Sequence, residues 1–128
     1  MDELAAVLMI LMGVAIAGVW TRDILAGEKI DLTHGIFAAR DPDAGTLFWP
    51  HWLAEYATAA MLIAAAVGLL VDANWAAALG GLAIGALLYT SINSLAWALS
   101  KGDRLGYAVP MLAGVAVGLF VAVHLVTR

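Results

Sequence analysis

The chain has 128 residues, of which 64% are hydrophobic and only 12% are charged. Water-soluble domains carry about 25% charged residues, so this composition excludes an ordinary soluble surface and favours a protein that is embedded in lipid. The sequence contains no cysteine and has a net charge of −4, which excludes disulfides, thiolate metal sites and a basic surface for nucleic acid.

Four stretches of the sequence are long and apolar enough to cross a bilayer, because about 30 Å of hydrocarbon takes roughly 20 helical residues. We predict membrane-spanning helices over residues 4–20, 50–71, 75–99 and 105–127. The chain begins Met1-Asp2-Glu3, without the basic segment of a signal peptide, so we expect the first helix to be retained. The predicted fold is therefore all-α: a single polytopic domain over residues 1–128, built as a four-helix transmembrane bundle.

The connections between the spans differ in length. Nearly thirty residues separate the first span from the second, and a structureless loop of that length is unusual in a compact domain. A short interfacial helix is predicted there from the apolar residues Ile30, Leu32, Ile36 and Phe37. By contrast, only Asp72-Ala73-Asn74 joins the second span to the third, which predicts a tight antiparallel hairpin with a capping residue at Asp72 or Asn74.

Basic residues indicate the orientation of the chain. Five Lys and Arg residues lie in the first and third loops, and one, Arg128, lies at the opposite end. Since cytoplasmic loops carry the excess of positive charge, we expect both larger loops in the cytoplasm and both termini outside. An aromatic belt is then predicted at the cytoplasmic interface from Trp20, Trp49, Trp52 and Trp97.

Small residues recur every four positions in three of the spans. The patterns are Gly81-xxx-Gly85, Gly114-xxx-Gly118 and the series Ala60, Ala64 and Gly68. Membrane helices associate through close packing of such residues. The sequence leaves two alternatives open, namely packing within the bundle and contact with a second copy in a homo-oligomer.

Polar residues gather in the cytoplasmic half of the second and third spans. On the second, His51, Glu55 and Thr58 follow i, i+4, i+7 spacing and share one face. On the third, Tyr89, Asn93 and Trp97 follow i, i+4, i+8 spacing, with Thr90 and Ser94 beside them. Glu55 lies about 7–8 Å and Asn93 about 9 Å inward from the same side, so the two residues are expected at nearly one level.

An ionisable residue inside a span is a functional-site hypothesis by default. Glu55 has the chemistry to bind an amphipathic cation or a quinone headgroup, or to carry a proton. The structural alternative is that Glu55 ties the second helix to the third through Asn93, His51 or Tyr89. The sequence leaves both possibilities open.

Histidine does not support a haem site within one subunit. His51 and His124 lie near opposite ends of the bundle, so they cannot ligate one iron. If the first loop folds over the bundle, His34, His51 and Glu55 would form a metal set of two imidazoles and one carboxylate, a less favoured alternative. His124 is expected to be an interfacial residue. No phosphate-binding loop, nucleophile elbow or HExxH motif occurs, so we do not expect the chain to be catalytic on its own.

The segment AEYATAAMLIAAAVGLL, with LLYTSIN further on, resembles the DoxX-like group of small prokaryotic four-helix membrane proteins. The likeness covers about residues 50–99: an acid early in the second helix, small residues up to a Gly-Leu-Leu end, and the tight turn. The first helix lacks the basic residue and the glycine–lysine ending typical of that group, and LLYTSIN is closer to uncharacterised four-span proteins of similar layout. The resemblance implies a prokaryotic inner membrane, a link to quinone-dependent oxidoreductase complexes, and Glu55 as the counterpart of the helix-two acid.

Three functions agree with this pattern. The first is a module of a redox complex that holds a quinone-like or other amphipathic ligand. The second is a homo-oligomeric transporter or channel that uses Glu55 for a proton or cation. The third is an accessory subunit of a larger membrane complex without chemistry of its own.

The first function assigns a role to each candidate residue. Glu55 exchanges a proton or hydrogen bond with the ligand, and His51 orients it. The remaining candidates, which bind or cover the ligand, are Asn93, Tyr89, Thr58, Trp52 and Trp97.

Overall fold

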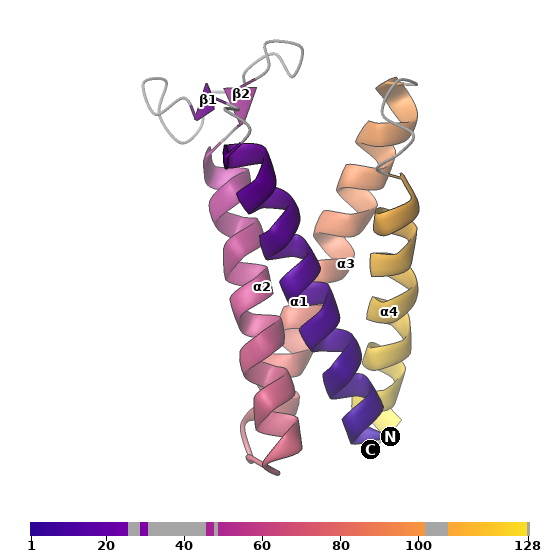
Figure 1. Cartoon of the computed structure of the whole chain (residues 1–128). Coiled ribbons are helices and arrows are strands. Elements are labelled where there is room, and N and C mark those ends of the chain that lie inside the picture. Colours follow the sequence, from indigo (N-terminus) through magenta and orange to yellow (C-terminus); the bar gives the residue numbers. More distant parts are fainter. Residues whose placement is uncertain (26–28, 31–45, 48, 102–107, 128) are drawn as a thin grey trace.

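The computed structural model describes residues 1–25, 29–30, 46–47, 49–101 and 108–127, except for the side chains of 23–24, 29–30, 46–47, 49–51, 97–98 and 100–101. The helices are α1 (Asp2–Leu25), α2 (Trp49–Leu70), α3 (Ala76–Lys101) and α4 (Ala108–Thr127). Each helix is long and apolar enough to cross a membrane, which confirms the all-α, four-helix fold. Two short strands, β1 (Lys29–Ile30) and β2 (Thr46–Leu47), pair in parallel at one end of the bundle (Figure 1).

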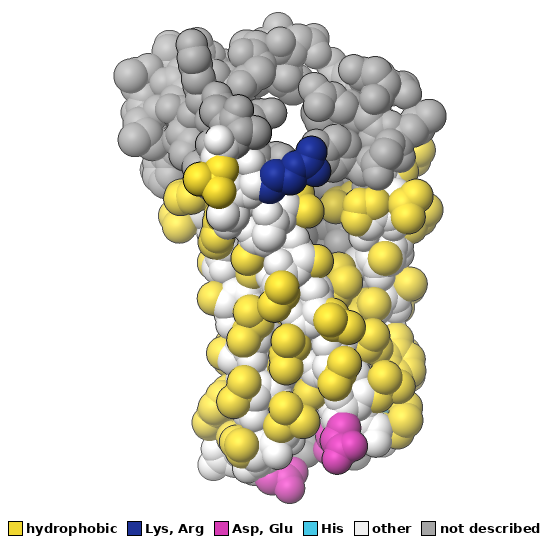
Figure 2. All heavy atoms as spheres, viewed as in Figure 1, with side chains coloured by type: hydrophobic (Ala, Val, Ile, Leu, Met, Phe, Trp, Pro, Cys, Tyr) yellow, Lys and Arg dark blue, Asp and Glu magenta, His cyan; other side chains and the backbone are white. Residues whose placement is uncertain are grey.

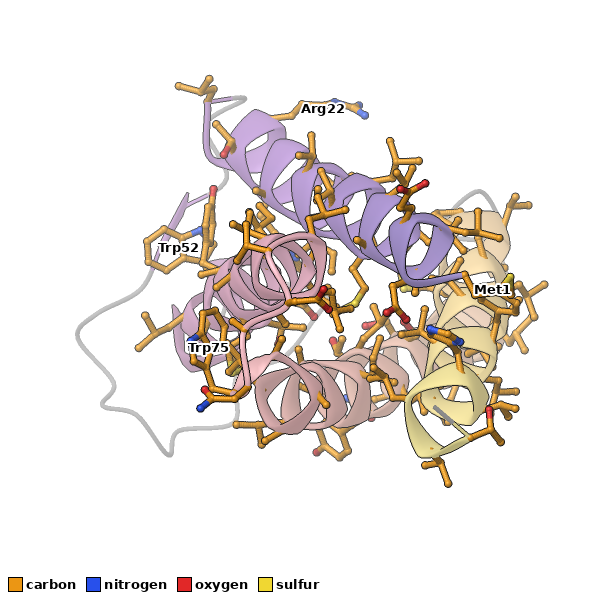
Figure 3. All side chains as sticks on the ribbon, turned by 90° about the horizontal axis from the view of Figure 1, so that it is seen from below. Met1, Arg22, Trp52 and Trp75 are labelled. Atoms are coloured by element: carbon orange, nitrogen blue, oxygen red, sulfur yellow. The ribbon has the colours of Figure 1, made fainter. Side chains whose placement is uncertain are left out.

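The helices follow one another around the bundle in chain order. α1 packs on α2, α2 on α3 and α3 on α4, whereas α1 and α4, which close the ring, pack less closely than these three pairs (Figure 3). Both termini lie at one end, and β1, β2, the end of α3 and the start of α4 lie at the other (Figure 1). We call these the terminus end and the loop end. On the face seen in Figure 2, described side chains between the acidic residues at one end and the basic residue at the other are mostly apolar.

The helix boundaries agree with the predicted spans to within a few residues. α1 continues past Trp20 to Leu25, and α4 begins at Ala108. Pro110 therefore lies in the first turn of α4, where its missing N–H costs no intrahelical hydrogen bond. The predicted interfacial helix falls mainly on residues 31–45, outside the described residues, while Ile30 belongs to β1.

The hairpin between α2 and α3 is as tight as predicted. Asp72 adopts a left-handed backbone conformation, with φ of 53°. The N–H of Ala73 donates to the carbonyl of Gly68 at 2.9 Å, and that of Asp72 donates to the carbonyl of Leu69 at 3.3 Å. These two bonds form a Schellman motif that satisfies carbonyl groups at the end of α2. Asp72 thus ends α2 through its backbone conformation.

Small residues set how closely the helices approach. The core is apolar and consists mainly of alanine, leucine and methionine side chains from α1, α2 and α3. A Cβ atom on Gly13 of α1 would lie 2.9 Å from the backbone carbonyl oxygen of Ala59 on α2. On α4, a Cβ on Gly118 would lie 2.6 Å from Leu88 of α3, and one on Gly114 would meet the Ser91 hydroxyl. The 114–118 pattern is therefore an intramolecular contact.

The other two small-residue patterns face largely outward. A Cβ on Gly81 or Gly85 of α3 would meet no atom within 4 Å. Ala60 and Ala64 of α2 are exposed as well, whereas Gly68 lies under the indole of Trp75. Only part of the small-residue pattern is therefore used within one chain.

The terminus end is closed by a polar contact that the sequence did not indicate. Nε2 of His124 on α4 lies 2.6 Å from Oδ1 of Asp2 on α1. His124 lies near the end of α4, and its predicted place at a membrane interface stays a prediction. The contact joins the first turn of α1 to the last turns of α4, which are the least closely packed of the four pairs of helices adjacent around the bundle.

We expect the Gly13→Ala substitution to lower the free energy of unfolding by about 1–3 kcal/mol, the usual cost of overpacking. The added methyl would collide with a backbone oxygen of α2, which cannot rotate away. Gly18→Ala on the same helix is the matched control, since nothing lies within 4 Å of a Cβ there. Both variants gain the same helix propensity, so equal stabilities in a detergent unfolding titration would contradict the close α1–α2 contact.

Candidate functional site

Glu55 is the charged residue that the structure places inside the bundle. It lies in the second turn of α2, and its side chain is 5% exposed. The same face of α2 continues into the apolar core through Ala59, Leu62 and Ala66. Glu55 is therefore buried because it lies at helical spacing from the apolar residues by which α2 packs into the core. A carboxyl group buried in a membrane-length helix requires polar partners, because hydrocarbon offers none.

A partner of Glu55 is Thr90 on α3. Its hydroxyl Oγ1 donates a hydrogen bond to Oε1 of Glu55. Hydrogen bonds to a carboxylate are among the stronger ones in proteins. The contact links α2 to α3 near the loop end and fixes the direction in which the carboxyl group points.

Two further polar side chains are buried near this contact. Thr58 is one helical turn deeper on α2 and donates a hydrogen bond to the carbonyl of Ala54 at 2.8 Å. Ser91 follows Thr90 on α3 and packs against Gly114 of α4. With Glu55, these are the buried polar residues among those described, and none of them lies in the terminus half of the core.

An aromatic pair lies beside Glu55 on α2. The rings of Trp52 and Tyr56 contact each other edge to face, with centroids 5.1 Å apart. The hydroxyl of Tyr56 lies 2.5 Å from that of Thr21, which links α2 to the end of α1. The indole N–H of Trp52 is buried and has no hydrogen-bond partner among the residues that the structure describes. This group is a donor available to a carbonyl oxygen.

The predicted site residues on α3 do not all converge on Glu55. Tyr89 is 75% exposed and Asn93 is exposed, both on the outer side of α3. Residues three positions apart are rotated by about 60° around a helix, so Thr90 and Asn93 cannot face α2 equally. The depth along α3 at which a partner of Glu55 was predicted is nearly right, since Thr90 lies less than one turn from Asn93. The residue that makes the contact, however, is Thr90.

Some predictions concern side chains outside the described residues. His51 and Trp97 belong to α2 and α3, but their side chains are not among those described, and His34 lies outside as well. The proposed roles of His51 and Trp97, and the His34–His51–Glu55 metal set, therefore stay predictions. Within the described residues, no three His, Asp or Glu side chains form a group that could hold a metal ion.

The side chains around Glu55 have the chemistry to form hydrogen bonds with a polar group. Glu55 supplies a carboxyl group that accepts or donates a hydrogen bond according to its protonation, and Thr90 supplies a hydroxyl. The indole of Trp52 adds an unsatisfied donor and an aromatic face. No family model, curated protein or solved structure matches this chain, so the residues themselves are the basis for function.

From the sequence, Thr90 was predicted to lie next to the site residues and not to bind Glu55 itself. The contact between Tyr56 and Thr21 was not predicted. Tyr89, Thr90, Ser91 and Asn93 are all polar, so polarity alone could not show which of them faces α2. In the structure, Ala83, Ile84 and Leu87 form the buried face of α3. Leu82 and Ile92 are as apolar but are exposed, so the sequence pattern did not mark that face. Thr90 lies at the edge of that face.

We expect Thr90→Val to lower the free energy of unfolding by about 1–3 kcal/mol, because it removes a hydrogen bond from a buried carboxyl group. Thr58→Val is the control, since the Thr58 hydroxyl bonds to the backbone of its own helix. A double-mutant cycle with Glu55→Gln, measured by detergent unfolding, should show coupling for Thr90 and little for Thr58. Additive effects of Thr90→Val and Glu55→Gln would contradict the contact.

Proposed function

We propose that this chain is a small integral membrane protein that holds a quinone-like or other amphipathic ligand at Glu55. The observation that carries the proposal is the buried Glu55 carboxyl group with the Thr90 hydroxyl directed at it from a neighbouring helix. Burying a carboxyl group in a membrane helix costs several kcal/mol. A hydroxyl or amide would link α2 to α3 at lower cost, so the carboxyl group itself points to function.

The ligand would lie with its polar head at Glu55 and Thr90 and its apolar part along the core. A ligand carbonyl would accept a hydrogen bond from the indole N–H of Trp52, which has no partner within the described part of the chain. His51 would orient or relay a proton to Glu55, and Trp97 would cover the flat face of the ligand. Tyr89 and Asn93, which face outward, contribute to this site only if they reach it around the side of α3.

The membrane setting is part of the proposal. The excess of Lys and Arg in the two larger loops favours a loop end in the cytoplasm and termini outside, in a prokaryotic inner membrane. The DoxX-like resemblance favours a role as a module of a quinone-dependent redox complex. In that role a partner protein would supply electrons, and this chain would position the ligand.

The alternatives have less support. A proton- or cation-linked transporter needs a polar path, and the described core between the Glu55 region and the His124–Asp2 contact is apolar. Such a path would therefore need a second copy of the chain to supply its other wall. An accessory subunit without a ligand would leave the cost of burying Glu55 unexplained.

Binding can be tested with a short-chain alkyl benzoquinone and with dodecylamine, added to the protein in lipid nanodiscs and followed by quenching of tryptophan fluorescence. We expect saturable binding of at least one probe, weakened about 10- to 100-fold by Glu55→Gln through loss of a charge-assisted hydrogen bond.

The control is Glu3→Gln, which changes an exposed carboxyl group at the terminus end. Nanodiscs without protein correct for partition of the probes into lipid. If neither probe binds saturably, or if Glu55→Gln and Glu3→Gln bind alike, Glu55 is a structural link between α2 and α3 and the proposal fails.

A further inference from the structure

The outer face of α3 carries an ordered set of residues that the bundle does not use. Gly81, Gly85, Tyr89 and Asn93 follow one another at intervals of four, so they form one continuous row along the helix. All four are exposed. A Cβ on either glycine would meet nothing within 4 Å, whereas Gly13, Gly68, Gly114 and Gly118 each receive a side chain or backbone from a neighbouring element.

The amide of Asn93 is a second, independent observation on the same row. It lies within the part of α3 that is apolar enough to cross a membrane. Its side chain is exposed and makes no hydrogen bond to another described residue. A polar group that faces hydrocarbon without a partner is costly, so an amide at this depth indicates a polar partner from outside the bundle.

We propose that this row, Gly81, Gly85, Tyr89 and Asn93, is the interface through which two copies of the chain form a parallel dimer. An amide is donor and acceptor at once and can therefore pair with an identical amide. Copies inserted in the same orientation bring equal residues to equal depth. The row is thus complementary to itself, as a two-fold interface requires.

The spacing of the row also sets the geometry of the dimer. Rows of residues four apart pack together when two helices cross in the right-handed sense, at about −40° to −50°. The two glycines allow the helix backbones to approach closely. The ring of Tyr89 from one copy then fills the space above Gly85 of the other, and the two Asn93 amides lie further along the same contact.

The dimer face and the Glu55 site are adjacent and separate. Tyr89 points outward, and the next residue, Thr90, donates to Glu55. The dimer does not require a ligand at Glu55, so its test is independent of the proposed function.

The test measures association of the full chain in liposomes, by single-molecule photobleaching at increasing dilution. We expect a monomer–dimer equilibrium that Gly85→Ile weakens at least about 10-fold and Asn93→Leu weakens about 3- to 30-fold. The matched control is Ala116→Ile, since Ala116 is an exposed small residue on α4. Glu3→Gln, at the exposed terminus end, should leave the equilibrium unchanged.

Because the chain contains no cysteine, single cysteines report contacts without background. Gly81→Cys should cross-link two copies in native membranes, whereas Ala113→Cys on the outer face of α4 should not. A monomeric wild type, which would leave the row to lipid or to a different protein, overturns the proposal. So does a dimer that is unchanged by Gly85→Ile and Asn93→Leu, or one that Ala116→Ile disrupts equally.

Discussion

The four helices are long and apolar enough to cross a membrane, where hydrocarbon would provide neither hydrogen-bond partners nor a hydrophobic driving force between helices. Helices associate where small residues allow close contact, as Gly13 does between α1 and α2 and as Gly114 and Gly118 do between α3 and α4. Polar side chains are stable where a partner meets them, as Thr90 meets Glu55. The position of the candidate site follows from both conditions, because close packing of α2 on α3 brings the hydroxyl within reach of the carboxyl group.

The number, order and approximate bounds of the helices could be predicted from the sequence, because hydrophobic length is a direct consequence of bilayer thickness. The hairpin at Asp72 could be predicted as well, since three residues permit no wider connection. That Glu55 and Thr58 share one face of α2 followed from their spacing, whereas their burial did not. These are properties of a single helix or of a short connection, and they need no knowledge of how helices are rotated against one another.

Rotation is what the sequence did not determine. α3 has polar or small residues on nearly every side, so its apolar pattern is weak, and Asn93 was expected where Thr90 is found. The same ambiguity applies to glycine, since Gly81 and Gly114 have the same local pattern but only Gly114 faces another helix of the bundle. The His124–Asp2 contact joins the two ends of the chain, and no local signal connects residues so distant in sequence.

Three consecutive residues of α3 show how one helix serves three environments. Tyr89 faces outward, Thr90 faces Glu55 on α2, and Ser91 packs against Gly114 on α4. A rotation of α3 by one residue, about 100°, would expose Thr90 and lose its bond to Glu55. Packing of Ser91 and Leu88 against the glycines of α4 opposes that rotation. The α3–α4 contact therefore holds the Glu55–Thr90 pair together, although α4 contributes no residue to it.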